Sequence, residues 1–250
     1  MTKIGIIGGS GLEDPDLLKN PASIPMNTPY GDPSSSLIQG KIKGVSVVIL
    51  SRHGRNHEIP PTHVNNRANI YALQEAGCTH IVTTTACGSL REEIGRGDLV
   101  IPDQFIDFTR HRAVTFHDSF DEGNLQHAAM ADPFSDVLRK TIISAAGKLN
   151  LKIHPSGTIV TIEGPRFSTR AESRMFRAWG ADLINMSIAP EVVLANEIGI
   201  PYATIAMSTD YDSWKEDEEP VTWEEVLKIF KINVDNVLQL LIQSIQMIDE

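Results

Sequence analysis

Two carboxylates stand two positions apart after a short apolar run in the last quarter of the chain. Asp210 and Asp212 follow Ala203–Met207, and in extended backbone their side chains point to the same side. Paired carboxylates in a partly apolar site raise the pKa of one member, which lets that acid donate a proton near neutral pH. The alternative is a solvated acidic cap, because Lys215–Glu219 is also rich in charge. The pair alone leaves both interpretations open.

A glycine-rich turn, Gly8–Gly11, follows the first apolar run. Its glycines let backbone N–H groups approach an anion, and Ser10 adds a hydroxyl donor. A dinucleotide-binding turn needs a helix, a second strand and an acidic residue about 20 positions on. Asn20–Tyr30 is instead rich in Pro and Asn. A phosphate contact is therefore favoured over a dinucleotide site, with a tight turn that binds nothing as the remaining alternative.

A cationic segment follows the apolar run Val45–Leu50. Arg52 and His53 stand where a predicted strand ends, which is where α/β proteins collect ligands, and a guanidinium suits an oxyanion. His53 and His57 have a spacing open to metal ligands, but the neighbouring arginines repel a cation and no carboxylate motif surrounds them. We therefore predict an anion contact and no metal site, with a plain surface charge as the alternative for Arg52.

Two further strand ends carry candidate contacts. Thr83–Ser89 offers hydroxyl and backbone donors for an anion. Its Cys87 has no activating base that the sequence identifies, which favours a buried side chain over a nucleophile. Phe167 follows a Gly-Pro turn and could stack on a heterocycle, although an aromatic residue in that place is more often part of a core.

The elements that must position these residues alternate along the chain. Short β-branched runs predict buried strands, and helical patterns lie between several of them, which is typical of βα units. The predicted strands are Ile4–Ile7, Val45–Leu50, His80–Thr85, Thr158–Ile162, Leu183–Met186 and Ala203–Met207. The predicted helices are Val64–Ala76, Pro133–Leu149, Ala171–Trp179 capped by Thr169 and Glu172, Glu191–Ile198, and a long amphipathic terminal helix capped by Thr222 and Glu225. The sheet should be largely parallel or mixed.

Length, charge and cysteines narrow the class of protein. The 250 residues suit one α/β domain over 1–250, and Asp107–Ala129, polar and without periodicity, is predicted to be a functional loop. A net charge of −10 disfavours nucleic acid as a partner. Two cysteines without CxxC spacing fit a reducing cytoplasm, and Ile4–Ile7 is too short for a signal peptide or a membrane span.

Taken in chain order, these motifs resemble the purine nucleoside phosphorylase family, and within it the branch of S-methyl-5′-thioadenosine phosphorylases. The segments that carry the resemblance are the Gly-Gly-Ser-Gly turn, Arg52–Gly54, Thr84–Ser89, Glu163–Ser168, Asn185–Ser187, and Thr209–Asp212 with Trp214. Each motif alone is weak, whereas six in the family's order are specific. The resemblance implies a three-layer α/β/α sandwich around a mixed, partly barrel-like sheet. It also implies no cofactor and a homotrimer or dimer of trimers with active sites near subunit boundaries.

The resemblance also implies a role for each matching residue. The implied phosphate contacts are Ser10, Arg52, His53, Thr85, Ala86 and Ser187. The implied nucleoside contacts are Phe167 on the base, Met186 under the ribose, Asp210 at N7 and Asp212 at the 6-amino group, Val226 at the methylthio group, and His127 from a neighbouring subunit. The chain departs from the family at Ser187-Ile188, where mammalian relatives have two threonines, and at Trp223, which is bulkier than the usual aliphatic residue.

The expected reaction is phosphate-dependent cleavage of S-methyl-5′-thioadenosine to adenine and 5-methylthioribose 1-phosphate, with Asp210 as proton donor. A phosphorylase of 6-oxopurine nucleosides or of methylthioinosine is the alternative within the family, and it should carry an amide in place of the base-facing acid. A non-catalytic nucleotide- or anion-binding module is the alternative from another class, and a nicotinamide dehydrogenase is weaker still. The binding module would use the glycine turn but would not need paired acids beside a stacking aromatic.

Overall fold

One mixed sheet of eleven strands forms the centre of the computed structural model, which describes residues 1–8, 17–217 and 222–249 without the side chains of Trp223 and Ile232. The strands are β1 (Lys3–Gly8), β2 (Lys19–Ile24), β3 (Leu37–Ile42), β4 (Val45–Ser51), β5 (His80–Ser89), β6 (Leu99–Val100), β7 (Gln104–Phe108), β8 (Ile153–His154), β9 (Thr158–Ile162), β10 (Leu183–Asn185) and β11 (Tyr202–Asp210). Their order is β2-β3-β4-β1-β5-β10-β9-β7, and β11 pairs with both β5 and β6 while β8 pairs with β6. Parallel and antiparallel pairs both occur, which confirms the predicted mixed sheet.

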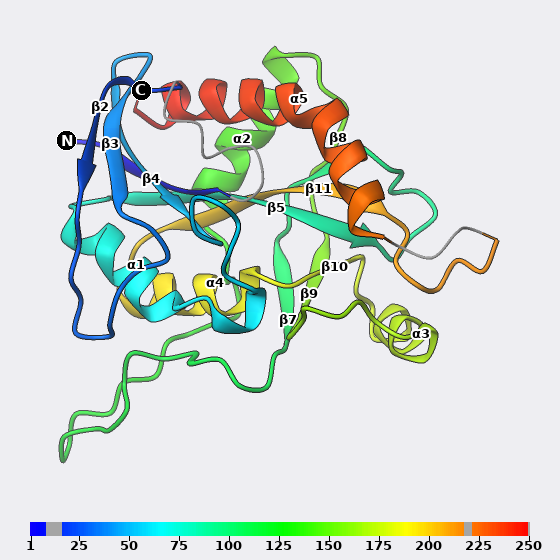
Figure 1. Ribbon diagram of the computed structural model, residues 1–250, viewed down its shortest axis with the longest axis horizontal. Coiled ribbons are helices and arrows are strands. Elements are labelled where there is room, and N and C mark those ends of the chain that lie inside the picture. The colour runs from blue at the N-terminus through cyan, green and yellow to red at the C-terminus, as the bar shows by residue number, and fades with distance from the viewer. Residues whose placement is uncertain (9–16, 218–221, 250) are drawn as a thin grey trace.

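Helices cover both faces of this sheet. In the described chain the α-helices are α1 (Asn66–Glu75), α2 (Asp136–Lys148), α3 (Arg170–Ala178), α4 (Ile188–Glu197) and α5 (Trp223–Asp249), with a short 3₁₀ helix η2 (Pro61–His63) before α1. Figure 1 shows α2 and α5 on one face and α1 and α4 on the other, with α3 beside β9 and β10. This confirms the predicted three-layer α/β/α arrangement. None of the helices in the described residues combines the length and apolar composition needed to cross a membrane.

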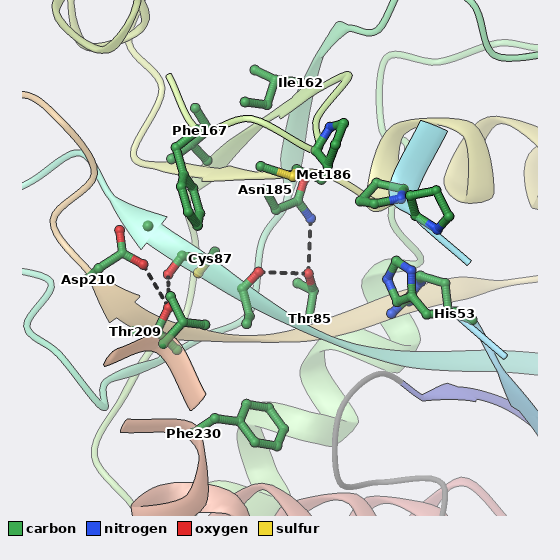
Figure 2. A pocket seen from close by; sticks show the side chains of 18 of the residues that line it. His53, Thr85, Cys87, Ile162, Phe167, Asn185, Met186, Thr209, Asp210 and Phe230 are labelled. Carbon is green, nitrogen blue, oxygen red and sulfur yellow. Dashed lines mark hydrogen bonds between the residues drawn. The ribbon is translucent and has the colours of Figure 1, made fainter. Parts of the chain in front are cut away.

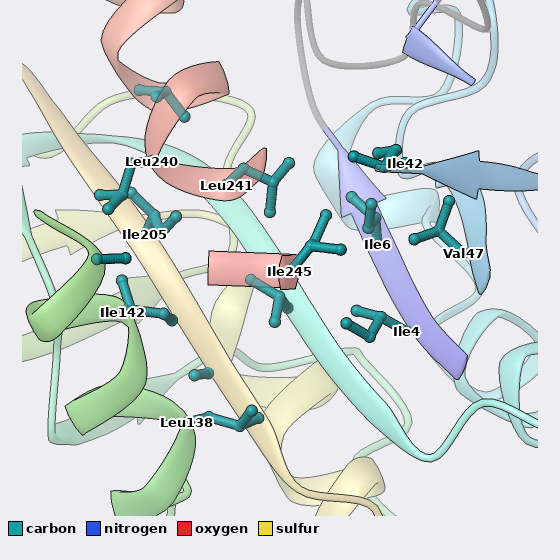
Figure 3. Close-up of a cluster of buried hydrophobic side chains, with 14 of the residues drawn as sticks. Ile4, Ile6, Ile42, Val47, Leu138, Ile142, Ile205, Leu240, Leu241 and Ile245 are labelled. Carbon is teal, nitrogen blue, oxygen red and sulfur yellow. The ribbon is translucent and has the colours of Figure 1, made fainter. Parts of the chain in front are cut away.

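Each interface between sheet and helices has its own apolar core. On the α2 and α5 side, Ile4 and Ile205 of the sheet pack with Ile142 of α2 and Leu241 and Ile245 of α5 (Figure 3), and all five are fully buried or nearly so. The apolar stripe that predicted an amphipathic terminal helix is the face that α5 turns to this core. A second core lies between the sheet and α1 and α4. The strands β5 and β11 contribute buried side chains to both cores.

The sheet divides along one side of β5, and this division shapes the site. The first half of β5 pairs with β1 up to Thr83, whereas its end pairs with β10 at Gly88 and Ser89. On its other side β5 stays paired with β11 along nearly its whole length. Residues 84–87 therefore have a neighbouring strand on one side and a gap on the other. A pocket can open there without loss of the sheet's continuity.

The six predicted strands and five predicted helices are all present, but other elements differ from expectation. The sequence did not predict the strand β2 at Lys19–Ile24. β2 is exposed and contains a proline, and β6 and β8 have only two residues each, so none carries a periodic apolar signal. β7 takes the first residues of the predicted 107–129 loop, and the rest of that segment lacks helix or strand apart from one isolated bridge.

The predicted capping box at the start of α3 is confirmed and gives a stability prediction. The Thr169 hydroxyl accepts from the Glu172 amide at 3.1 Å, and the Glu172 carboxylate accepts from the Thr169 amide at 2.8 Å. We expect Thr169→Ala to lower the free energy of unfolding by about 1 kcal/mol, because the helix loses a cap. Urea unfolding measures this. Thr141→Ala, inside α2, is the matched control and should be neutral or slightly stabilising; equal losses in both variants would contradict the capping role.

Candidate active site

A pocket of about 440 Å³ opens where the sheet divides at β5. The strand ends of β5, β10 and β11 supply its floor, and residues 52–61 and the start of α5 form its walls. The predicted contacts that line it are Arg52, His53, Thr85, Ala86, Phe167, Met186, Asp210, Asp212 and Val226. Figure 2 shows Asp210 and Phe167 at one end and His53 at the opposite end. Groups from six separate segments thus meet around one cavity with two chemically different ends.

Of the other three predicted contacts, Ser187 and His127 do not line this pocket. Ser10 belongs to the segment 9–16 and lies outside the described residues. Ser187 is buried just behind the pocket wall, where its hydroxyl lies 3.1 Å from that of Thr85. His127 is exposed and packs on Phe120 with ring centroids 5.5 Å apart, in a segment that extends away from the sheet and helices (Figure 1). His127 therefore makes no contact with the pocket of its own chain.

The acidic end of the pocket is built by the end of β11. Asp210 is 7% exposed and Asp212 is 8% exposed, so the alternative of a solvated acidic cap is wrong. Both side chains line the pocket as predicted, but not through continued extended backbone. The strand ends at Asp210, and Asp212 adopts a left-handed φ of 47°, which aspartate tolerates better than most residues. Gly88 leaves room for them, because a Cβ there would lie 2.8 Å from Asp210 Oδ1.

Hydrogen bonds fix both carboxylates. Asp210 Oδ2 accepts from the Thr209 hydroxyl at 2.8 Å, and Asp210 Oδ1 accepts from the Asp212 amide at 2.8 Å. Asp212 Oδ1 accepts from the Ser168 hydroxyl at 3.2 Å. Burial raises the pKa of both carboxyl groups, and these hydrogen bonds offset the rise only in part. The two carboxyl groups therefore keep a proton at a higher pH than aspartic acid side chains do in water.

The opposite end of the pocket carries a guanidinium and a neutral imidazole. Arg52 is 2% exposed, so the alternative of a surface charge is wrong. His53 Nδ1 lies 2.9 Å from the carbonyl oxygen of Ile59 and must donate to it, which leaves Nε2 as an acceptor. Burial, aided by the positive charge of Arg52, lowers the pKa of His53 to about 4. His53 is therefore neutral at physiological pH.

The low pKa of His53 predicts how stability depends on pH. The unfolded chain binds a proton near pH 6.5 and the folded chain only near pH 4, so the stabilisation is complete above 6.5 and is lost as pH falls through this window. We expect the free energy of unfolding of the wild type to fall by roughly 1–2 kcal/mol more than that of His53→Asn when the pH is lowered from 7 to 4.5. This value is reduced for the partial exposure of the ring. Asparagine can still donate to Ile59. Urea unfolding at both pH values measures the difference, and identical losses would contradict the assigned protonation state.

A buried polar network lies behind the pocket floor. Asn185 donates to the hydroxyls of Thr85 at 3.2 Å and Ser187 at 3.3 Å, and it accepts from Thr161 at 2.7 Å. These bonds tie β5, β9 and β10 together beneath Met186. The hydroxyl of Thr85 is thereby held at the pocket surface, as an anion contact requires.

The aromatic wall is supplied by the turn after β9. Phe167 is 38% exposed, so it belongs to the pocket mouth and the alternative of a core residue is wrong. Arg112 holds the base of this turn by donating to the carbonyl oxygens of Glu163 at 2.6 Å and Met186 at 2.7 Å. From α5, Val226, Leu227 and Phe230 add an apolar wall. The pocket therefore offers a flat ring and an aliphatic surface between its polar ends.

Sequence reasoning missed several residues of this site. Glu191, Arg112, Asn185 and Ser168 all hold a pocket residue in place. Glu191 carried the clearest signal, because it is an acid within the apolar run Ile188–Ala195 and such a residue needs a buried partner. Cys87 is 3% exposed, which confirms the predicted buried side chain, and burial raises the pKa of its thiol well above the usual range. No three His, Cys, Asp or Glu side chains of the described ranges come together as a metal site.

Known proteins are similar to this chain over nearly its whole length. Residues 3–246 match the profile of the phosphorylase superfamily. The chain belongs to the phosphorylase superfamily. An S-methyl-5′-thioadenosine phosphorylase from Danio rerio is 56% identical over 248 residues, covering 98% of this chain and 89% of the relative, and one from Xenopus tropicalis is 55% identical with the same coverage.

Solved structures of superfamily members have the same fold. Methylthioadenosine phosphorylase from Schistosoma mansoni in complex with adenine superposes with a TM-score of 0.95 at 42% identity, covering 100% of this chain and 92% of that one. A point mutant of adenosine/methylthioadenosine phosphorylase from the same organism, in complex with methylthioadenosine, gives a TM-score of 0.93 at 41% identity with the same coverage. These likenesses confirm the predicted family and the predicted fold class of this superfamily member.

Proposed function

We propose that this phosphorylase cleaves S-methyl-5′-thioadenosine with inorganic phosphate to give adenine and 5-methylthioribose 1-phosphate. The observation that carries the proposal is a pocket with two buried acids of raised pKa at one end and Arg52 with neutral His53 at the other. Phe167 and the apolar wall of α5 supply the rest of the surface that a ligand would contact. The names of the similar proteins and the methylthioadenosine and adenine in the similar structures support the same substrate.

At the anion end, phosphate would be placed beneath the sugar. Cleavage of the bond between the sugar and the base leaves positive charge on the ribosyl ring, which a phosphate oxygen at C1′ stabilises before it forms the new bond. Arg52 would bind phosphate oxygens through charge-assisted hydrogen bonds. His53 Nε2 can only accept, so it suits the O–H of monoprotonated phosphate. Ser10, Thr85, Ala86 and Ser187 complete the proposed phosphate contacts.

At the acidic end, Asp210 would donate its proton to N7 of adenine as the bond breaks, so that the base leaves neutral. Thr209 can support both protonation states, because its hydroxyl lies 2.8 Å from Asp210 Oδ2 and 3.2 Å from the carbonyl oxygen of Cys87. When Asp210 is protonated, the Thr209 hydroxyl donates to the carbonyl oxygen of Cys87. Once Asp210 has released its proton, the same hydroxyl can turn and stabilise the carboxylate. Asp212 would accept from the 6-amino group.

Other parts of the proposal concern the remaining contacts and the assembly. Phe167 would stack on the base, Met186 would lie under the ribose, and Val226 would face the methylthio group. We propose one domain over residues 1–250 that assembles as a homotrimer or dimer of trimers, with His127 reaching a neighbouring subunit's pocket. It would work in the cytoplasm in purine and methionine salvage, without a cofactor, nucleic acid or membrane, and with phosphate as co-substrate.

The proposal is tested by measuring release of free base from methylthioadenosine, adenosine, inosine and methylthioinosine, each with and without phosphate. We expect adenine from methylthioadenosine only when phosphate is present. Greater release from the two 6-oxopurine nucleosides would favour the alternative within the family. Binding of all four nucleosides without release of base would favour a non-catalytic module.

A further inference from the structure

A buried ion pair lies behind the anion end of the pocket. It joins Arg52, directly after β4, to Glu191 of α4, which is fully buried. Arg52 Nε and Nη2 donate to Glu191 Oε1 and Oε2 at 2.5 and 3.0 Å, and Nη1 donates to the carbonyl oxygen of Thr84 at 2.9 Å. Three bonds to two elements therefore set the plane and the direction of the guanidinium.

The carboxylate of Glu191 is itself held from the opposite side. The Tyr202 hydroxyl on β11 donates to Glu191 Oε2 at 2.8 Å and lies 2.9 Å from the hydroxyl of Thr83 on β5. Tyr202 is 1% exposed, and neither it nor Glu191 lines the pocket. Glu191 therefore makes no direct contact with a ligand in this pocket, and the pocket residue that it bonds is Arg52.

The ion pair could affect an anion in two ways, through the charge of Arg52 or through the direction of its guanidinium. Glu191 cancels most of the positive charge that Arg52 would otherwise present to an anion. If the charge of Arg52 alone mattered, loss of Glu191 would strengthen phosphate binding. If the direction of the guanidinium matters, loss of Glu191 would weaken binding, because a planar fork binds an oxyanion only when its N–H groups point at the oxygens. The three directed bonds on Arg52 favour the second role.

We propose that Glu191 is a positioning residue for phosphate. It aims the Arg52 guanidinium into the pocket, and Tyr202 in turn holds Glu191. The phosphate site thus depends on a carboxylate that never touches phosphate. This inference rests on the proposed function, because it takes phosphate as the ligand of Arg52.

Two variants test the role without replacing a residue that lines the pocket. In Glu191→Gln an NH₂ group replaces one carboxylate oxygen. This NH₂ group cannot accept from the guanidinium, so one of the two hydrogen bonds between residues 52 and 191 is lost. In Tyr202→Phe only the supporting hydroxyl is lost and no charge changes. We expect the KM for phosphate to rise roughly 10- to 100-fold in Glu191→Gln and roughly threefold in Tyr202→Phe, as loss of charged and single neutral hydrogen bonds implies.

The KM for the nucleoside and the affinity for adenine without phosphate should stay within about twofold, because the acidic end is untouched. Inorganic phosphate should raise the thermal midpoint of both variants less than that of the wild type, and least in Glu191→Gln. This measurement needs no turnover. Ser244→Ala is the matched control, since it also removes a buried hydroxyl bond, 2.6 Å from the carbonyl oxygen of Leu240 in α5. It should leave phosphate binding unchanged.

An unchanged or lowered KM for phosphate in the folded variants would overturn the inference. If Glu191→Gln does not fold, Tyr202→Phe still tests the inference. It removes one buried hydroxyl, as Ser244→Ala does, and we expect both of these variants to fold. Failure of the wild type to release adenine with phosphate would instead overturn the proposed function. In that case the phosphate-dependent thermal shift still tests Glu191, so the two failures are distinguishable.

Discussion

Replacement of Asp210 by asparagine is expected to reduce kcat with methylthioadenosine by roughly 10²- to 10⁴-fold, the usual contribution of a general acid. Asparagine keeps the shape of the side chain but cannot protonate N7 during bond cleavage. Its side-chain oxygen can still accept from the Asp212 amide. Its Nδ2 can donate to the Thr209 hydroxyl, which can itself donate to the carbonyl oxygen of Cys87, so the pocket should remain formed. Steady-state kinetics at saturating phosphate measure the effect, and affinity for adenine should change far less than kcat.

Asp182→Asn is the matched control for Asp210→Asn. Asp182 is partly buried and bonds Arg91 at 2.7 Å, so the same substitution there lowers stability, but Asp182 does not line the pocket. Turnover should stay near that of the wild type. Near-normal kcat in Asp210→Asn, or an equal loss in the control, would remove Asp210 as the proton donor.

The second large effect concerns the base. The 6-amino group only donates hydrogen bonds, so it suits an acceptor on Asp212, whereas a 6-oxo group would face that carboxylate with a second acceptor. An unpaired buried polar group of this kind costs about 2–4 kcal/mol, which corresponds to a preference of roughly 30- to 1,000-fold in kcat/KM for 6-aminopurine nucleosides. Asp212→Asn should narrow the preference, because its amide offers both a donor and an acceptor.

The comparison needs substrates that differ only at position 6. Methylthioadenosine against methylthioinosine and adenosine against inosine form two such pairs, so the effect of the base is separated from that of the 5′ group. Both pairs should show the preference and both should lose part of it in Asp212→Asn. Equal kcat/KM values within each wild-type pair would contradict recognition of the base by Asp212.

The parts of the fold that sequence could predict are those with strong local patterns. The runs that became β1, β4, β9 and β11 are buried on both faces, so their apolar character is continuous. The exposed or very short strands β2, β6 and β8 lack such a pattern and depend on pairing with neighbours. The division of the sheet at β5 is a property of strand pairing between distant segments, so no local signal announces it.

The candidate site was predictable to the extent that its groups stand at strand ends. Asp210, Asp212, Arg52 and Thr85 all follow or end predicted strands. Burial then excluded the surface alternatives for Asp210, Asp212 and Arg52. Glu191 was not found because its role depends on a partner 139 positions away. Side chains that support a contact from a distant helix carry no motif of their own.

The most direct test of the proposed reaction is a product balance on methylthioadenosine with inorganic phosphate. Adenine is measured by chromatography, and the phosphorylated sugar and the remaining phosphate are measured by phosphorus NMR. We predict that each adenine released is matched by one phosphate consumed and one 5-methylthioribose 1-phosphate formed. Adenine released together with unphosphorylated sugar, or no adenine released at all, would contradict phosphorolysis.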